Sequence, residues 1–254
     1  MTVPQNDLSV PPIFSAVAID PDRDPFAAAR DMAMDGADPA TIVWTPQGDR
    51  ADCAVILSPD TALTPSLLVT YVVMNAIGDT LGALIPPVIP LAFGWPDRIL
   101  MNGATVGGLR ADWAKPETPD AVPEWMVLGV TLVMRPASDE DAPRLANQTT
   151  MVEEGCVELT PVDILESFSR HLLYWMNRWQ DESFGPIKAA WLARAAGYGS
   201  NTDLETGGDW AGRKLLSLQV DGSVQYSDDG DETTETLEHA LRHPTWQNQR
   251  PENA

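Results

Sequence analysis

The feature that most constrains the fold of this chain lies in residues 93–110, where two apolar runs flank Asn102-Gly103. Asn-Gly is the dipeptide that best tolerates two successive positive φ angles, which a two-residue hairpin turn requires. The runs on either side of the turn are therefore predicted to be antiparallel strands. Trp95-Pro96 is expected at the first residues of the first strand or on a sheet edge, because proline has no N–H to donate to a neighbour.

Two consecutive glycines, Gly107 and Gly108, stand in the predicted return strand. Glycine inside a strand usually marks a β-bulge, or a place where a ligand or another backbone approaches closely. The pair therefore predicts a patch without side chains beside the turn. Trp95 is expected to form a wall of the same pocket.

These residues resemble the central hairpin of the biotin/lipoate–protein ligase superfamily. In that family one strand commonly carries Lys-Trp-Pro-Asn-Asp-(Ile/Leu), and the return strand carries Lys-(hydrophobic)-(Ala/Gly)-Gly-(Ile/Leu). The matching stretches here are Gly94-Trp95-Pro96-Asp97-Arg98-Ile99 and Thr105-Val106-Gly107-Gly108-Leu109. The framework residues match and the charged ones do not, since Gly94 stands where the family has its lysine.

The resemblance implies an α/β (α+β) fold, in which a mixed, largely antiparallel sheet is covered by helices, over residues 13–197. Residues 160–196 resemble the closing helical pair of biotin ligases, and residues 127–132 resemble a family strand that keeps Gly129 but has Thr131 in place of a second glycine. The remaining parts are expected to be a flexible N-terminus (1–12), a small C-terminal β appendage (210–242) and a disordered tail (243–254).

The resemblance also implies a binding site for a small carboxylic acid such as biotin or lipoate, formed by Asp24, Trp95, Pro96, Asp97, Gly107, Gly108 and Leu109. The family usually places a Ser/Thr-Asn element, which holds the ureido end of biotin, where this chain has Arg23-Asp24. The Asp24 carboxylate can accept a hydrogen bond from a ligand N–H. The same residue precedes Pro25 and is also a good N-cap for a helix over residues 25–35.

Active ligases of this family use ATP and Mg²⁺ to convert the acid into an acyl-adenylate, which then passes to a lysine of a carrier-domain protein. Two anions that meet at one phosphorus need preorganised cations. The family's Gly- and Arg-rich loop is reduced here to the connection 45–50, which contains one Gly and one Arg. No other Gly-rich phosphate cradle and no metal-ligand cluster is present in the sequence.

Arg98 and Arg110 remain as the candidate cations for the carboxylate or phosphate. If residues 94–98 formed one continuous strand, Arg98 would lie roughly 13 Å from the lysine position, at about 3.3 Å per residue. The alternative is that Arg98 pairs with Asp97 or another acid at the surface. Two functions therefore stay open: a divergent acyl-adenylate ligase, and a non-catalytic relative that binds a small acid or a partner protein.

The chain carries 16 Lys and Arg against 37 Asp and Glu, a formal charge of −21. This balance argues against a nucleic-acid partner or an anionic membrane surface, because both require basic residues. The apolar stretch 67–95 contains Asp79 and three prolines, so it is predicted to be a buried helix and a strand instead of a membrane span. Cys53 and Cys156 show neither disulfide nor metal spacing, and no signal peptide is recognised, so a cytoplasmic location is expected.

Overall fold

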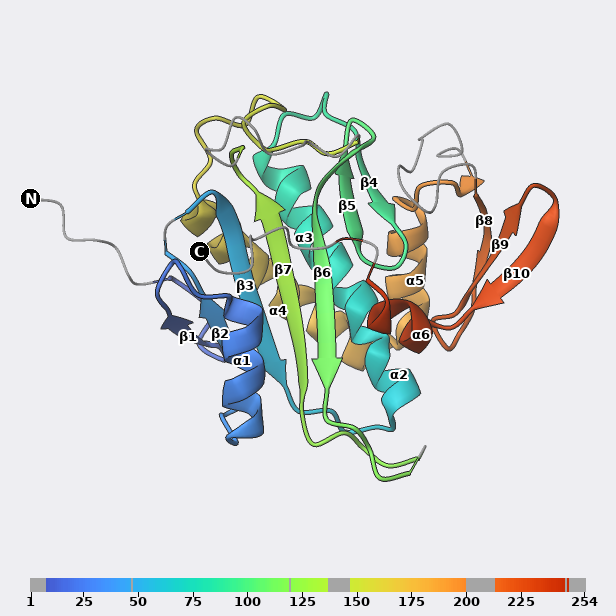
Figure 1. The fold of residues 1–254 in the computed structure, drawn as a ribbon, viewed down its shortest axis with the longest axis horizontal. Helices are drawn as coiled ribbons and strands as arrows, with labels where there is room; N and C mark the ends of the chain where they lie inside the picture. Colours follow the sequence, from blue (N-terminus) through green and yellow to red (C-terminus); the bar gives the residue numbers. More distant parts are fainter. Residues whose placement is uncertain are drawn as a thin grey trace, which may run out of the picture.

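The computed structural model describes residues 8–46, 48–118, 120–136, 147–199, 213–244 and 246. They form a seven-stranded sheet with helices on both faces and a separate three-stranded sheet (Figure 1). Neighbouring strands of the large sheet pair antiparallel, except for one parallel pair at its edge. This confirms the predicted α/β (α+β) fold with a mixed, largely antiparallel sheet and a small C-terminal β appendage.

The large sheet has the strand order β1-β2-β3-β7-β6-β5-β4. In chain order its strands are β1 (Ser15–Ala18), β2 (Thr41–Trp44), β3 (Arg50–Leu57), β4 (Leu91–Gly94), β5 (Arg98–Met101), β6 (Ala104–Trp113) and β7 (Met126–Val133). β1 and β2 form the parallel pair. The central strands β3, β7 and β6 are the longest and are almost entirely buried, so they form the rigid platform of the molecule.

Helices cover the two faces of this sheet unequally. The back of the sheet in Figure 1 is covered by α2 (Leu63–Leu67), α3 (Val69–Leu84), α4 (Pro161–Glu182) and α5 (Phe184–Leu192), which enclose the large apolar core. The front carries α1 (Pro25–Met34), whose alanines pack on Val43, Ile56 and Val127. We call the front side the α1 face and the back side the core face.

The helix termini follow the capping residues of the sequence. Asp24 caps α1 by accepting a hydrogen bond from the Phe26 N–H (3.1 Å), with Pro25 in the first turn. Thr160 and Asp163 form a reciprocal capping box at the start of α4. The apolar segment 63–84 is divided at Leu68 into α2 and α3.

The segment Leu63–Leu84 is long and apolar enough to cross a membrane by length and composition alone. However, 78% of its most apolar window is buried inside the protein, against α4, α5 and the sheet. Such burial is typical of the core helix of a globular domain, as the interrupted apolar stretch had predicted.

The central hairpin contains one strand more than the sequence predicted. β4 ends at Gly94, a turn with a cis Trp95-Pro96 peptide bond follows, and β5 begins at Arg98. The expectation of one strand that runs from Trp95-Pro96 into the apolar run is therefore wrong. The predicted turn at Asn102-Gly103 is confirmed, with φ angles of 49° and 82°, and β5 and β6 shift register at a bulge beside Gly107.

The C-terminal appendage contains β8 (Lys214–Leu218), β9 (Val224–Asp228), β10 (Asp231–Glu235) and α6 (Leu237–Arg242). The sequence predicted the first two strands and the helix but not β10, whose residues are acidic or Thr and lack an apolar alternation. In Figure 1, α6 lies beside the part of β6 that extends beyond the pairing with β5.

A few residues of the predicted flexible N-terminus and disordered tail lie against the rest of the protein. In the predicted flexible N-terminus, Leu8 is buried in the large core and the Ser9 N–H donates to Glu166 (2.9 Å). In the predicted disordered tail, Trp246 is only 5% exposed. The other residues of these segments, 1–7, 245 and 247–254, lie outside the described residues, as do residues 210–212 of the appendage.

Candidate functional site

The candidate site is built on one row of cross-strand partners that spans five strands. Asp52 of β3 pairs with Thr131 of β7, which pairs with Gly108 of β6. Gly108 pairs with Arg98 of β5, and Arg98 with Gly94 of β4. Directly paired residues in antiparallel strands point to the same side, so all five face the α1 side of the sheet.

Two residues of this row, Asp52 and Arg98, are charged, and both are buried. Asp52 is 1% exposed and accepts a short hydrogen bond from the Thr131 hydroxyl. Arg98 is 4% exposed. Charged side chains are buried at low cost only where they are paired and hydrogen-bonded, as Asp52 is with Thr131.

Arg98 lies over the residue that takes the place of the family lysine. An ideal Cβ on Gly94 would stand 3.1 Å from Arg98 Nε and 3.2 Å from Arg98 Cβ. The sequence-based separation of roughly 13 Å, at about 3.3 Å per residue, assumed a continuous strand and is therefore wrong. The two residues are direct partners across β4 and β5, because the turn at 95–97 folds the chain back. Arg98 thus lies against Gly94, the position where the resemblance expects the family's lysine.

Arg110, the second candidate cation, faces the same side two residues beyond Gly108. Its guanidinium forms a bidentate pair with the Asp24 carboxylate, with both N–O distances 2.7 Å, and stacks 4.5 Å above the Phe26 ring. The pair is partly exposed, with side-chain exposures of 18% for Arg110 and 27% for Asp24. Asp24 is therefore a helix cap and an ion-pair partner in this structure.

Each of two glycines on the α1 face is covered by an aromatic side chain. A Cβ on Gly129 would stand 2.7 Å from the Phe26 ring, and Gly129 is the cross-strand partner of Arg110. A Cβ on Gly108 would stand 3.0 Å from two ring atoms of Trp246 and 2.5 Å from the Asp97 carbonyl oxygen. The absence of side chains at these positions therefore lets Phe26 and Trp246 lie directly on the sheet.

Asp97 links the hairpin turn to this aromatic cover. Its side chain is 1% exposed, and its carboxylate accepts a hydrogen bond from the backbone N–H of Trp246 (3.3 Å). Its carbonyl oxygen accepts from the Leu109 N–H (2.7 Å). The predicted site residues Asp24, Asp97, Arg98, Gly108 and Arg110 are thus brought together on the α1 face.

Three other predicted ligand-binding residues point to the core face. Trp95 and Leu109 belong to the large apolar core. Trp95 Nε1 donates to the Tyr71 hydroxyl (2.8 Å), so this indole braces the hairpin against α3. A Cβ on Gly107 would meet the backbone of β7 at the Thr131 carbonyl, so this glycine serves strand packing. Pro96 is buried in the turn between β4 and β5.

The connection between β2 and β3 spans residues 45–49, of which Gln47 lies outside the described residues. Arg50 opens β3 two residues before Asp52 and so shares its α1-facing side. The connection has the short length that the sequence predicted. The connection contains a single glycine, so it forms no glycine-rich cradle for a phosphate. Arg50, at the start of β3, is the cation next to it.

No group of His, Cys, Asp and Glu side chains that could hold a metal ion occurs among the residues that the structure describes. The two cysteines are buried thiols. Burial raises the pKa of Cys53 well above its usual value, and the neighbouring Asp52 charge adds to this shift. Cys53 is therefore a protonated core residue and not a nucleophile.

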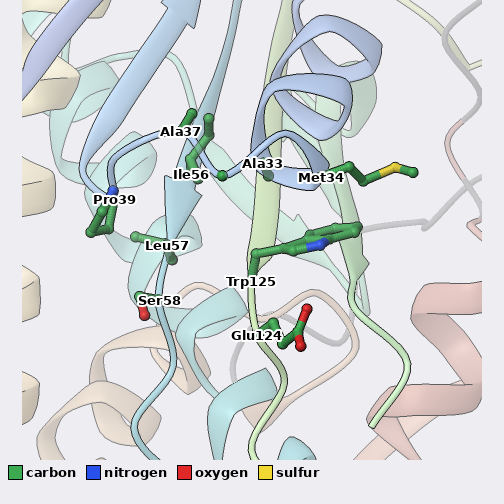
Figure 2. Close-up of a pocket in the computed structure, with 10 residues that line it drawn as sticks. Ala33, Met34, Ala37, Pro39, Ile56, Leu57, Ser58, Glu124 and Trp125 are labelled. Atoms are coloured by element: carbon green, nitrogen blue, oxygen red, sulfur yellow. The ribbon is translucent and has the colours of Figure 1, made fainter.

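A separate shallow pocket of about 220 Å³ lies at the other end of α1 (Figure 2). Met34, Ile56 and Trp125 supply most of its visible apolar lining, and Glu124 and Ser58 stand at its lower side in Figure 2. α1 separates it from Asp24 by roughly 15 Å, since the helix rises about 1.5 Å per residue over its length. It does not include any predicted site residue.

Asp52 and Trp246 are the site residues that the sequence analysis missed. A signal for Asp52 was present, because it is a lone carboxylate within the apolar run of β3. For Trp246 the only signal was a tryptophan inside a polar terminal stretch. Its place on Gly108 depends on the path of the chain after α6, which no local pattern reveals.

Comparisons with known proteins agree with this architecture. The model of the biotin/lipoate A/B protein ligase family matches residues 10–193. A biotin--[acetyl-CoA-carboxylase] ligase of Paracoccus denitrificans is 28% identical over 162 residues, 64% of this chain and 67% of that protein.

Solved structures extend the agreement to nearly the whole chain. A biotin protein ligase-like protein of unknown function from Silicibacter sp. tm1040 superposes with a TM-score of 0.79 at 26% identity, over 92% of this chain and 98% of that chain. Biotin protein ligase from Aquifex aeolicus superposes with a TM-score of 0.64 at 14% identity, over 88% and 99% of the two chains. The second likeness concerns the fold alone.

Proposed function

Because the chain belongs to the biotin/lipoate A/B protein ligase family, we propose that it binds a small carboxylic acid of the biotin or lipoate class on the α1 face of its sheet. The observation that carries this proposal is the position of Arg98. Its side chain lies over Gly94 and beside Gly108, so it presents a cation where the family resemblance places the lysine that meets the acid. Arginine also binds a carboxylate through two parallel hydrogen bonds.

The charge of the whole molecule makes this cation informative. With a formal charge of −21, the general field of the protein repels anions, so an acid is held only by a local concentration of positive charge. Arg50, Arg98 and Arg110 all start from the same side of the sheet. Arg98 is assigned the carboxylate, and Arg110, already paired with Asp24, orders the opposite wall of the site.

The polar groups around the arginines suit the other end of such a ligand. The carboxylates of Asp24, Asp52 and Asp97 stand on or beside the α1 face and are hydrogen-bond acceptors. A ligand that carries N–H groups as well as a carboxylate, as biotin does, would use both kinds of partner. Asp24, at the N-terminus of α1, is the proposed acceptor for the ligand N–H.

A second candidate function is transfer of the acid, as an acyl-adenylate, to a lysine of a carrier-domain protein. The cation at Gly94 favours it, because activation of a carboxylate at a phosphorus needs a preorganised positive charge. The short 45–49 connection favours binding without transfer, because it provides no glycine-rich cradle of backbone N–H groups for phosphates. The described residues therefore fit the carboxylate of the acid better than they fit ATP and Mg²⁺.

Titration of the purified full-length protein with biotin and with lipoate, followed by isothermal calorimetry, tests the proposal. We expect one of the two acids to bind with one molecule per chain. Addition of ATP, Mg²⁺ and labelled pyrophosphate then separates the two functions, since only an adenylate-forming protein exchanges the label into ATP. Absence of binding for both acids, at concentrations that saturate ordinary biotin ligases, would refute the proposed function.

A further inference from the structure

Trp246, which follows α6 in the chain, occupies the part of the α1 face that the proposed ligand needs. Its ring lies against Gly108, since a Cβ there would stand 3.0 Å from both Cδ2 and Cε3 of the indole. Its backbone N–H donates to the Asp97 carboxylate (3.3 Å). The side chain is 5% exposed. An aromatic ring and a polar N–H thus already fill a site built from a glycine and a carboxylate.

Trp246 differs from an ordinary core tryptophan in its surroundings. None of the three apolar clusters formed by the described residues includes it. Arg242, the last residue of α6, and the next two residues, His243 and Pro244, are exposed. A buried ring that belongs to none of these clusters can leave its place without opening them.

The position of Trp246 also determines whether a ligand can reach Arg98. Arg98 is the direct cross-strand partner of Gly108, and the indole covers Gly108. The Arg98 side chain is 4% exposed, so a carboxylate from solvent cannot contact its guanidinium in this arrangement. Some group on the α1 face must move before an acid and Arg98 can meet.

We propose that Trp246 is an internal occupant of the ligand site, and that its indole must leave Gly108 before an external acid binds. The Trp246 indole then acts as a built-in competitor of the ligand. This inference rests on the proposed function only for the identity of the competing acid. That a flat aromatic ring fits between Gly108 and Asp97 follows from the contacts of Trp246 alone.

The test uses the full-length Trp246→Ala variant, with Trp179→Ala as the matched control. Trp179 is a partly buried tryptophan on α4, on the core face. Removal of an aromatic side chain from a preformed seat leaves a cavity that a small aromatic molecule can fill. Free indole is therefore the first probe, and binding is measured by calorimetry.

We expect indole to bind Trp246→Ala with one molecule per chain and to bind neither the wild type nor Trp179→Ala. We further expect biotin or lipoate to bind Trp246→Ala at least tenfold more tightly than the wild type, and to displace indole from it. If indole binds Trp246→Ala but neither acid displaces it, the internal occupant stands and the proposed acid-binding function fails.

Two results would overturn the inference. One is a Trp246→Ala protein that is unfolded by circular dichroism, because Trp246 would then be a structural residue. The other is a folded Trp246→Ala protein that binds no indole, whatever its affinity for the acids, because no ring-shaped seat would then exist at Gly108.

Discussion

The side chain of Arg98 occupies the space into which any side chain at Gly94 would point, so the residues allowed at the two positions depend on each other. A Cβ on Gly94 would stand 3.1 Å from Arg98 Nε and 3.2 Å from Arg98 Cβ, tighter than nine in ten real Cβ contacts. A lysine at position 94 therefore requires the Arg98 side chain to shift, because the two compete for the same space. Arg98 thus lies at the position where the resemblance expects the family's lysine.

This competition for space predicts that the effects of changes at positions 94 and 98 on the free energy of unfolding are coupled. Gly94→Lys alone should lower the free energy of unfolding by about 1–3 kcal/mol, because it overpacks a buried contact. The same change made together with Arg98→Ala should cost clearly less, since the space is then vacant. Chemical denaturation of the two single variants and the double variant gives the coupling energy. Simple additivity of the two single changes would contradict the relationship.

Asp24 predicts a loss of binding when its carboxylate is removed. Asp24→Asn keeps the helix cap, because asparagine caps about as well as aspartate. It removes the carboxylate that is proposed to accept the ligand N–H and that fixes Arg110 through two contacts of 2.7 Å. The affinity for biotin, measured by calorimetry, should fall several-fold. An affinity that stays unchanged or rises in Asp24→Asn would assign the ligand N–H to another acceptor.

Replacement of Asp79 is expected to lower the stability of the fold without weakening acid binding. Its carboxylate accepts hydrogen bonds from Trp175 Nε1 (2.8 Å) and from the Arg194 guanidinium (2.6 Å), and so joins α3 to α4 and to the segment after α5. Asp79→Ala should lower the free energy of unfolding by about 1–3 kcal/mol, because two donors lose their acceptor. The acid affinity should stay within about twofold of the wild type, because Asp79 lies on the core face; a larger change would link this anchor to the site.

Buried thiol and phenol groups predict the alkaline limit of stability. Burial raises the pKa of Cys53 above its usual 9.0 and the pKa of Tyr71 above its usual 10.0, so the folded protein keeps both protons. The unfolded chain releases these protons near the usual pKa values. The two groups therefore contribute fully to the free energy of unfolding below those values, and this contribution is lost as the pH rises past them.

We expect the free energy of unfolding to fall steadily between about pH 8 and about pH 11. Denaturant titrations at several pH values measure it. Cys53→Ala should lower the stability at neutral pH and reduce the alkaline slope, because one of the two titrating groups is removed. An unchanged slope in this variant, or a flat profile in the wild type, would show that the thiol is not held in its protonated form.

Local signals were sufficient for most of the fold. The Asn102-Gly103 turn, the caps at Asp24 and Thr160, and the interrupted apolar stretch before the hairpin each specify backbone geometry over a few residues, and the structure contains all of them. The glycine pair correctly marked a bulge and a close approach. These features depend on neighbours in sequence, so a single chain reveals them.

The candidate site was less predictable, because it depends on contacts between distant parts of the chain. Leu109 and Trp95 belong to the right hairpin but face the core, since one missed turn at residues 95–97 changes which residues share a side. The same turn brings Arg98 onto Gly94, which a continuous strand would forbid. Trp246 reaches Gly108 from 138 residues away in sequence, and no periodicity records such a contact.

Replacement of Arg98 is the most direct test of the whole account, because this one side chain is proposed to hold the ligand carboxylate. Arg98→Met keeps most of the stem and removes the charge, and Arg178→Met removes a partly exposed arginine on α4, which pairs with Glu182, as a control. Calorimetric titration with the acid that binds the wild type should show an affinity at least tenfold lower for Arg98→Met, about 1.4 kcal/mol, and no change for Arg178→Met. A folded Arg98→Met protein that binds the acid as tightly as the wild type would contradict the account.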